Sequence, residues 1–200
     1  MKIIYCNLFL LFFLFSFSQD DAYIASIEAF QDEYTEHYEN PKTSPYKKNT
    51  HLFNGHNFFP INEQFKVKAV FIPAESNAIL NTSTSRLAEY TKLGVLEFQL
   101  EGKTIQLAIY YSDGYAKDED YADKAFVPFM DLTNGETTYA NGRYCYVKLP
   151  TKDGEEVVLD FNKSTNPYCA YVGRYSCTVP PEENEMDIAI LAGVKNPNNK

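Results

Sequence analysis

The side chains best suited to chemistry lie near expected strand ends in the second half of the chain. Arginine stands out among them because its two-pronged guanidinium can grip a carboxylate or a phosphate. We therefore expect a pocket for a small polar or anionic ligand around this group. The candidate ligand-binding residues are Arg143, Asp160, Asn162, Asn166, Asp131, Tyr139 and Tyr144.

The alternation of side chains along a strand predicts which of these residues face one another. Arg143 and Cys145 should share one face of their strand, with Tyr144 on the other. Asp160 and Asn162 should likewise share a face, opposite their apolar neighbours. An ion pair between Arg143 and Asp160 across adjacent strands is then expected.

Three kinds of function are compatible with this polar cluster. The favoured one is a binding module that holds its ligand around Arg143, Asp160 and Asn162. The second is a hydrolase-like or isomerase-like enzyme in which Asp160 or Asp131 is the general acid or base. The third is a structural, envelope-associated protein without a ligand, in which the cluster only stabilises turns.

The cysteines offer a second candidate site, at Cys169 and Cys177. A cysteine nucleophile needs a base, and the best-placed histidine on general grounds is His56. The alternatives are buried thiols or a disulfide. The eight-residue spacing is neither a C-x-x-C motif nor, together with the three histidines of the chain, a zinc pattern. We therefore expect no metal and no cofactor.

The first residues have the layout of a secretory signal peptide. Lys2 precedes an apolar run from Leu8 to Phe17, and Ser16 and Ser18 stand three residues and one residue before the expected cleavage point. The apolar run is too short to span a membrane. We expect residues 1–18 to be removed, which leaves an exported protein, periplasmic or secreted, without a transmembrane span.

The rest of the chain is expected to form one globular domain. Apolar residues at helical spacing predict a helix over residues 20–40, within an N-terminal helix and connector at residues 19–56. Alternating patterns then predict seven to nine short strands within a β-rich core at residues 57–195, ahead of a tail at residues 196–200. This pattern is typical of an antiparallel β-barrel or sandwich with one amphipathic helix.

Two pieces of the strand pattern are specific enough to be tested. The segment "VLEFQLEGKTIQLAIYY" predicts a hairpin that turns at Glu101 and Gly102. The segment "DIAILAG", residues 187–193, alternates in hydrophobicity and predicts a last strand.

The charge of the chain limits its partners. Its 200 residues have a formal net charge of −9. An acidic surface disfavours nucleic acid and anionic lipid. Nothing in the pattern points to a particular protein partner.

Two motifs also carry a family resemblance: "FVPFMDLTNGETTYANGRY" and "LDFNKSTNPYCAYVGRYSCTVPPEEN". On these motifs the chain resembles the domain of unknown function 1684 family from about residue 20 to 195. The resemblance implies relatives but no activity, because the function of the family is unknown. Cys169 and Cys177 fall on the signature and Cys145 does not, so the resemblance implies that Cys145 is the leftover thiol.

Overall fold

The computed structural model describes residues 21–197, so the expected signal peptide at residues 1–18 lies outside the described part. Helix α1 spans Asp21–Glu39 and confirms the helix predicted over residues 20–40. It ends just before Pro41, which lacks an N–H and disfavours a helical conformation in the residue before it. The side chains that α1 buries are Tyr23, Ile27 and Tyr38.

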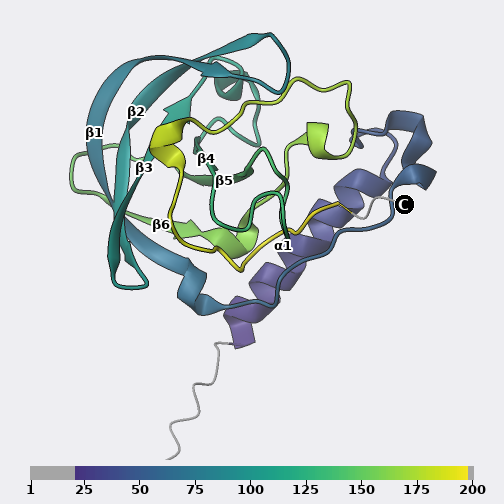
Figure 1. Ribbon diagram of the computed structural model, residues 1–200, viewed down its shortest axis with the longest axis horizontal. Coiled ribbons are helices and arrows are strands. Elements are labelled where there is room, and N and C mark those ends of the chain that lie inside the picture. Colours follow the sequence, from purple (N-terminus) through teal and green to yellow (C-terminus); the bar gives the residue numbers. More distant parts are fainter. Residues whose placement is uncertain (1–20, 198–200) are drawn as a thin grey trace, which may run out of the picture.

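Six antiparallel strands form one sheet in the order β5-β4-β3-β2-β1-β6. The strands are β1 (Lys66–Asn81), β2 (Leu87–Leu100), β3 (Lys103–Tyr111), β4 (Lys124–Phe129), β5 (Arg143–Lys148) and β6 (Glu156–Asp160). The sheet curls into a nearly closed barrel (Figure 1), and a bridge between Tyr144 and Thr165 joins β5 to the segment after β6. The predicted fold class, mainly β with one helix near the N-terminus, is confirmed.

The barrel interior holds the main hydrophobic core. In β1 the side chains of Val67, Ala69 and Phe71 point inwards, and Lys68 and Val70 between them are exposed. The predicted hairpin between β2 and β3 is also confirmed, since Glu101 and Gly102 both have a positive φ, as a tight two-residue turn requires.

A bulge in the β1–β2 hairpin creates a second, smaller core. The pairing register shifts between Pro73 and Ser76, and again between Lys92 and Gly94. A Cβ on Gly94 would lie 2.2 Å from the carbonyl oxygen of Ile72, so only glycine allows this close approach. Beyond the bulge, the hairpin packs on the outer face of the barrel. The buried members of this cluster are Leu80, Ala108, Tyr110 and Phe126.

The strand predicted at residues 187–193 is wrong. This segment does alternate in burial, with Ile188, Ile190 and Ala192 inside. Its backbone, however, forms no ladder with a neighbouring strand. The N–H of Ile190 donates to the carboxylate of Asp131, and its carbonyl accepts from a side chain. The described part of the chain therefore has six strands rather than seven to nine.

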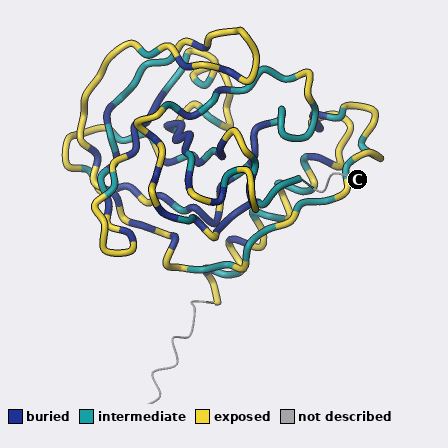
Figure 2. Tube along the Cα trace, in the orientation of Figure 1, coloured by how far each residue is buried: buried dark blue, intermediate teal, exposed yellow. Residues whose placement is uncertain are grey.

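Helix α1 lies against one side of the barrel, beside the C-terminal segment (Figure 1). Hydrogen bonds anchor it near both ends, from Tyr23 to Asp160 and from Tyr34 to the carbonyl of Asn166. Figure 2 shows that the buried stretches concentrate on the inner strands and on the helix face towards them. Over residues 21–197, no helix is long and apolar enough to cross a membrane.

Candidate functional site

Arg143, the first residue of β5, is enclosed by the protein. Its side chain has no exposed surface, and its Nη2 forms a 2.8 Å ion pair with Asp131. The guanidinium also donates to the carbonyls of three alternate residues of the C-terminal segment: Ile190 at 2.9 Å, Ala192 at 2.6 Å and Val194 at 3.3 Å. The positive charge is thus matched inside the barrel, and Nε is the one guanidinium nitrogen without a partner among the described residues.

The predicted Arg143–Asp160 pair is therefore wrong. Asp160 ends β6 with its side chain on the outer face of the barrel, where its carboxylate accepts from Tyr23 of α1, whereas Arg143 points inwards. The alternation within β5 was predicted correctly, since Arg143 and Cys145 point into the barrel and Tyr144 points out. Alternation sets the face of a side chain, but the order of strands in the sheet decides which residue it meets.

Asp131 follows β4 in a tight turn that uses both of its carboxylate oxygens. Oδ2 receives the guanidinium of Arg143, and Oδ1 accepts from the N–H and the hydroxyl of Thr133 at 2.9 and 2.6 Å. Gly142, at the other side of this loop, has a φ of +84° and passes so close to the carbonyl of Phe129 that a Cβ would lie 2.7 Å from it. The loop is therefore held by close packing and by the contacts of Asp131 with Arg143 and Thr133.

Asp160 and Asn162 join the barrel to helix α1. The carboxylate of Asp160 accepts from the hydroxyl of Tyr23 at 3.0 Å and from the backbone N–H of Asn162 at 3.0 Å. The amide of Asn162 also donates to Tyr23 and to the carbonyl of Asn62, and its oxygen accepts from the N–H of Asn62. Burial and the neighbouring Asp160 carboxylate raise the pKa of Tyr23 above its usual value.

Asn166 belongs to a buried polar cluster beneath the C-terminal half of α1. Its Nδ2 donates to the hydroxyl of Tyr171 at 3.2 Å, which is 2.9 Å from Nδ1 of His56. The rings of Tyr34 and Tyr38 pack on the imidazole, and burial lowers the pKa of His56 to about 3. Nε2 of His56 and Oδ1 of Asn166 have no partner among the described residues.

Tyr139 and Tyr144 lie with the cysteines rather than with Arg143. The hydroxyl of Tyr139 is 3.6 Å from Sγ of Cys169. The hydroxyl of Tyr144 donates to the carbonyl of Thr178, next to Cys177. Cys169 and Cys177 are both free thiols in the structure, and the N–H of Cys169 donates to Sγ of Cys177 at 3.1 Å. Their pairing as a disulfide stays a prediction.

His56 is not the base of a cysteine nucleophile. It hydrogen-bonds to Tyr171, and neither ring nitrogen has a hydrogen bond to a described cysteine. Cys145 is fully buried in the barrel, where desolvation raises the pKa of its thiol. Within residues 21–197, no three His, Cys, Asp or Glu residues are grouped so that they could hold a metal ion.

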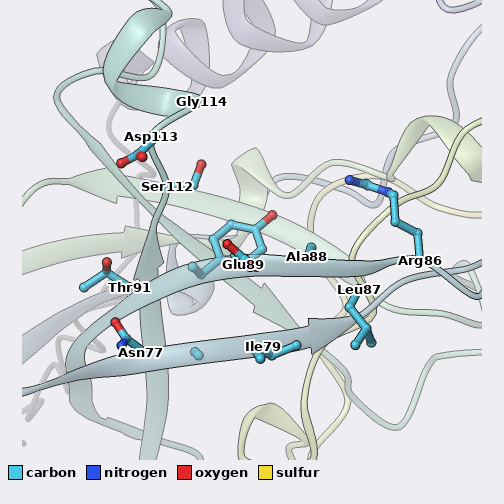
Figure 3. A pocket seen from close by; sticks show the side chains of 12 residues that line it. Asn77, Ile79, Arg86, Leu87, Ala88, Glu89, Thr91, Ser112, Asp113 and Gly114 are labelled. Carbon is cyan, nitrogen blue, oxygen red and sulfur yellow. The ribbon is translucent and has the colours of Figure 1, made fainter.

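An open groove of about 820 Å³ lies on the outside of the barrel, where the sequence predicted no site. The two strands of the β1–β2 hairpin form one part of it, and residues 112–114 after β3 form the other (Figure 3). The apolar part of its lining is Ala78, Ile79, Leu87 and Ala88, and the polar part is Asn77, Arg86, Glu89, Tyr90, Thr91, Ser112 and Asp113.

The comparisons with known proteins place the chain in a family. The family model described as "Protein of unknown function (DUF1684)" matches residues 51–195. The chain belongs to the DUF1684 family. It is also similar to the solution NMR structure of an uncharacterised protein of Haloarcula marismortui, with a TM-score of 0.67 and 29% identity over 87% of this chain and 94% of that one. No curated protein matches it.

In this structure, the polar residues that resemble the DUF1684 signature mostly form hydrogen bonds inside the protein that join one element to another. Arg143, Asp131 and Asn162 each satisfy backbone or side-chain groups of other elements. None of the groove residues falls on those motifs. No pattern in the sequence marks the groove, because the alternation of β1 stops at Phe71 and the residues that follow are mostly exposed.

Proposed function

We propose that this DUF1684 protein is an exported β-barrel module that binds a small, neutral, polyhydroxylated ligand such as a saccharide in the groove at the β1–β2 hairpin. One observation carries this proposal: the groove brings together exposed polar groups that the fold does not use. Asn77, Glu89 and Asp113 are exposed and have no side-chain partner among the described residues. Tyr90 also lines the groove and is partly accessible.

The charges of the groove favour a neutral ligand over an anion. Glu89 and Asp113 supply two carboxylates, whereas the one guanidinium, that of Arg86, already donates to Ser176 through Nε and Nη2. Carboxylates are strong acceptors for ligand hydroxyl groups. Tyr90 adds a partly accessible ring surface to the lining, while its hydroxyl is bonded to Thr178. Carboxylates together with an aromatic ring surface suit a sugar ring.

The groove is a better binding site than the cluster around Arg143. A ligand at Arg143 would have to displace Asp131 and three backbone carbonyls, and each buried group left without a partner costs about 1–3 kcal/mol. The enzymatic alternative meets the same obstacle, because the carboxylates of Asp131 and Asp160 are both occupied by internal donors. A general acid or base must reach its substrate.

Export rests on the N-terminal pattern, a short positive start followed by an apolar run and small residues up to Ser18. Protein recovered from the periplasm or the medium should therefore begin at Gln19, which N-terminal sequencing measures. A chain that keeps residues 1–18 would contradict export with cleavage.

An NMR titration with glucose, maltose and inositol tests the binding site. We expect these ligands to shift the amide signals of residues 77–79, 86–91 and 112–114. The double variant Glu89→Gln/Asp113→Asn should bind at least tenfold more weakly, because each hydrogen bond to a charged group contributes about 1.5–3 kcal/mol.

The matched control is Glu101→Gln, which changes an exposed carboxylate at the β2–β3 turn, away from the groove lining. It should bind as the wild type does. Shifts that appear only outside the groove, or equal affinity in the double variant, would rule the groove out. A response to inorganic phosphate in place of the sugars would contradict the neutral ligand.

A further inference from the structure

A second site, separate from the groove, is formed by Cys169 and Cys177. Cys169 lies in the short 3₁₀ turn Tyr168–Ala170, and Cys177 lies eight residues later, just before the bridge between Thr178 and Thr82. Both side chains are partly accessible to solvent. The N–H of Cys169 donates to the sulfur of Cys177 at 3.1 Å, and the two thiols are close enough to interact with each other.

The surroundings of the two sulfurs are not equivalent. The thiol of Cys177 has the largest influence on Sγ of Cys169, and the side chains of Ser83 and Tyr139 are its further hydrogen-bonding neighbours, with the hydroxyl of Tyr139 at 3.6 Å. These donors stabilise a thiolate and lower the pKa of Cys169 to about 6. Its partner shows the reverse, because the hydrogen bond with Cys169 and burial raise the pKa of Cys177. One sulfur is therefore prepared to be a nucleophile and the other to keep its proton.

The remaining titratable groups that face this pair are phenols. Tyr139 comes from the loop before β5, Tyr144 from β5 itself and Tyr168 from the cysteine loop. Burial and the neighbouring Cys169 raise the pKa of Tyr139 to about 12. These groups stay protonated at neutral pH, so they do not remove a proton from the cysteines. The hydroxyl of Tyr144 already donates to Thr178, which leaves Tyr139 as the phenol that can donate to the thiolate.

We propose that Cys169 and Cys177 form a reversible thiol–disulfide exchange site, in which Cys169 attacks a low-molecular-weight disulfide and Cys177 resolves the product. A low-pKa, accessible thiol beside a second thiol is the arrangement that redox-reactive cysteines have in common. This site goes beyond the proposed saccharide binding and does not depend on it.

The exchange takes place in two steps. The Cys169 thiolate attacks one sulfur of R–S–S–R, forms the mixed disulfide Cys169–S–S–R and releases RS⁻, which takes up a proton. Cys177 then loses its proton to solvent as its sulfur attacks Sγ of Cys169 and expels the second RS⁻, which is also protonated. The two protein thiols are oxidised to a disulfide, and the small disulfide is reduced to two thiols.

The fold does not need this disulfide as a staple. The loop is already held by the hydrogen bond between His37 and Tyr168 at one end and by Tyr90 and Tyr144 on Thr178 at the other. A bond that closes so short a loop would add only about 2–3 kcal/mol in the chain-entropy model. Opening and closing it therefore leaves the barrel folded.

Reaction with oxidised glutathione, followed cysteine by cysteine through peptide mapping, tests the proposal. In the reduced wild type we expect an internal Cys169–Cys177 disulfide, which millimolar reduced glutathione reopens while circular dichroism shows a folded protein. Cys177→Ser should instead accumulate a mixed disulfide on Cys169. In Cys169→Ser, oxidised glutathione should modify Cys177 at least tenfold more slowly than it modifies Cys169 in the wild type. Buried Cys145 serves as the unreactive internal control.

The pH dependence of alkylation provides the second readout. Half-maximal reactivity of Cys169 should lie near pH 6 in the wild type and remain low in Cys177→Ser, which keeps a hydroxyl donor. The pH of half-maximal reactivity should rise in Cys177→Ala and in Tyr139→Phe, because each variant removes one hydrogen-bond donor to the thiolate. A midpoint at about 8.5, the value of a free thiol, would overturn the proposal. So would a faster reaction at Cys177, or a disulfide that is reduced only after unfolding.

Discussion

At the scale of single residues, the polar side chains of this protein are of two kinds: some are buried and bonded inside the fold, and others are exposed to solvent. Arg143 is the clearest member of the first group, since its guanidinium is fully buried and bonds to Asp131 and the C-terminal carbonyls. A buried charge is tolerated only when its partners are complete. The exposed pair Lys68–Glu156 is its opposite, with most of both side chains in water.

This contrast predicts the cost of breaking each pair. Asp131→Asn and Arg143→Met should each lower the free energy of unfolding by about 3–5 kcal/mol, because a buried charge or its acceptors lose their partner. Lys68→Met should change it by less than about 1 kcal/mol. Urea denaturation followed by circular dichroism measures both. A loss of less than 1 kcal/mol in Arg143→Met would show that the buried network is not what holds this loop.

At the scale of elements, a side chain substitutes for missing strand pairing. Strands β3 and β4 share only the pair Tyr110 and Phe126. Where they separate, the amide of Asn184 accepts from the N–H of Ala108 and donates to the carbonyls of Ala108 and Pro128, all between 2.6 and 2.9 Å. The C-terminal segment thereby completes the hydrogen bonding of the sheet without being a strand.

Removing this connection should loosen the join between β3 and β4. Asn184→Ala leaves three buried backbone groups unpaired, so we expect a loss of about 3 kcal/mol or more in the free energy of unfolding. Asn184→Asp should be at least as harmful, because it places a carboxylate against two carbonyls. Asn141→Ala, which changes an exposed asparagine, is the control and should cost well under 1 kcal/mol. Equal melting of the three variants would contradict this role.

At the scale of the whole molecule, the helix is joined to the barrel through an aromatic layer around His56. The imidazole is packed among Tyr34, Tyr38 and Phe53, and its Nε2 has no acceptor among the described residues. Protonation would bury an unpaired positive charge at the helix–barrel interface. Burial therefore lowers the pKa of His56 to about 3, well below the value of about 6.5 in an unfolded chain.

This difference makes stability depend on pH. Between about pH 6.5 and pH 3 the unfolded chain binds a proton at His56 and the folded protein does not, so stability falls as the pH falls, by up to about 1.4 kcal/mol per pH unit. His56→Gln should have a flatter profile over the same window. Urea midpoints of both proteins from pH 7 to pH 4 measure the difference, and parallel profiles would show that His56 is protonated in the fold.

The sequence by itself determined the elements and the orientation of their side chains. The α1 stripe, the β2–β3 turn at Glu101 and Gly102, and the placement of Arg143 with Cys145 inside β5 all follow from spacing along the chain. Such features depend on neighbours a few residues away, through helical and strand periodicity and the conformational freedom of glycine. They could be predicted because they do not depend on contacts with residues far away in the sequence.

Only the tertiary structure decided which of these side chains meet. Arg143 points into the barrel and pairs with Asp131, whereas the carboxylate of Asp160 points out and accepts from Tyr23 of α1. In residues 187–193, the carbonyls of Ile190 and Ala192 bind that arginine instead of a neighbouring strand. The groove likewise joins the β1–β2 hairpin to residues 112–114, and Tyr139 reaches Cys169 from a separate loop. Alternation determines a face, whereas contact depends on strand order and chain path, and these result from the packing of the whole barrel.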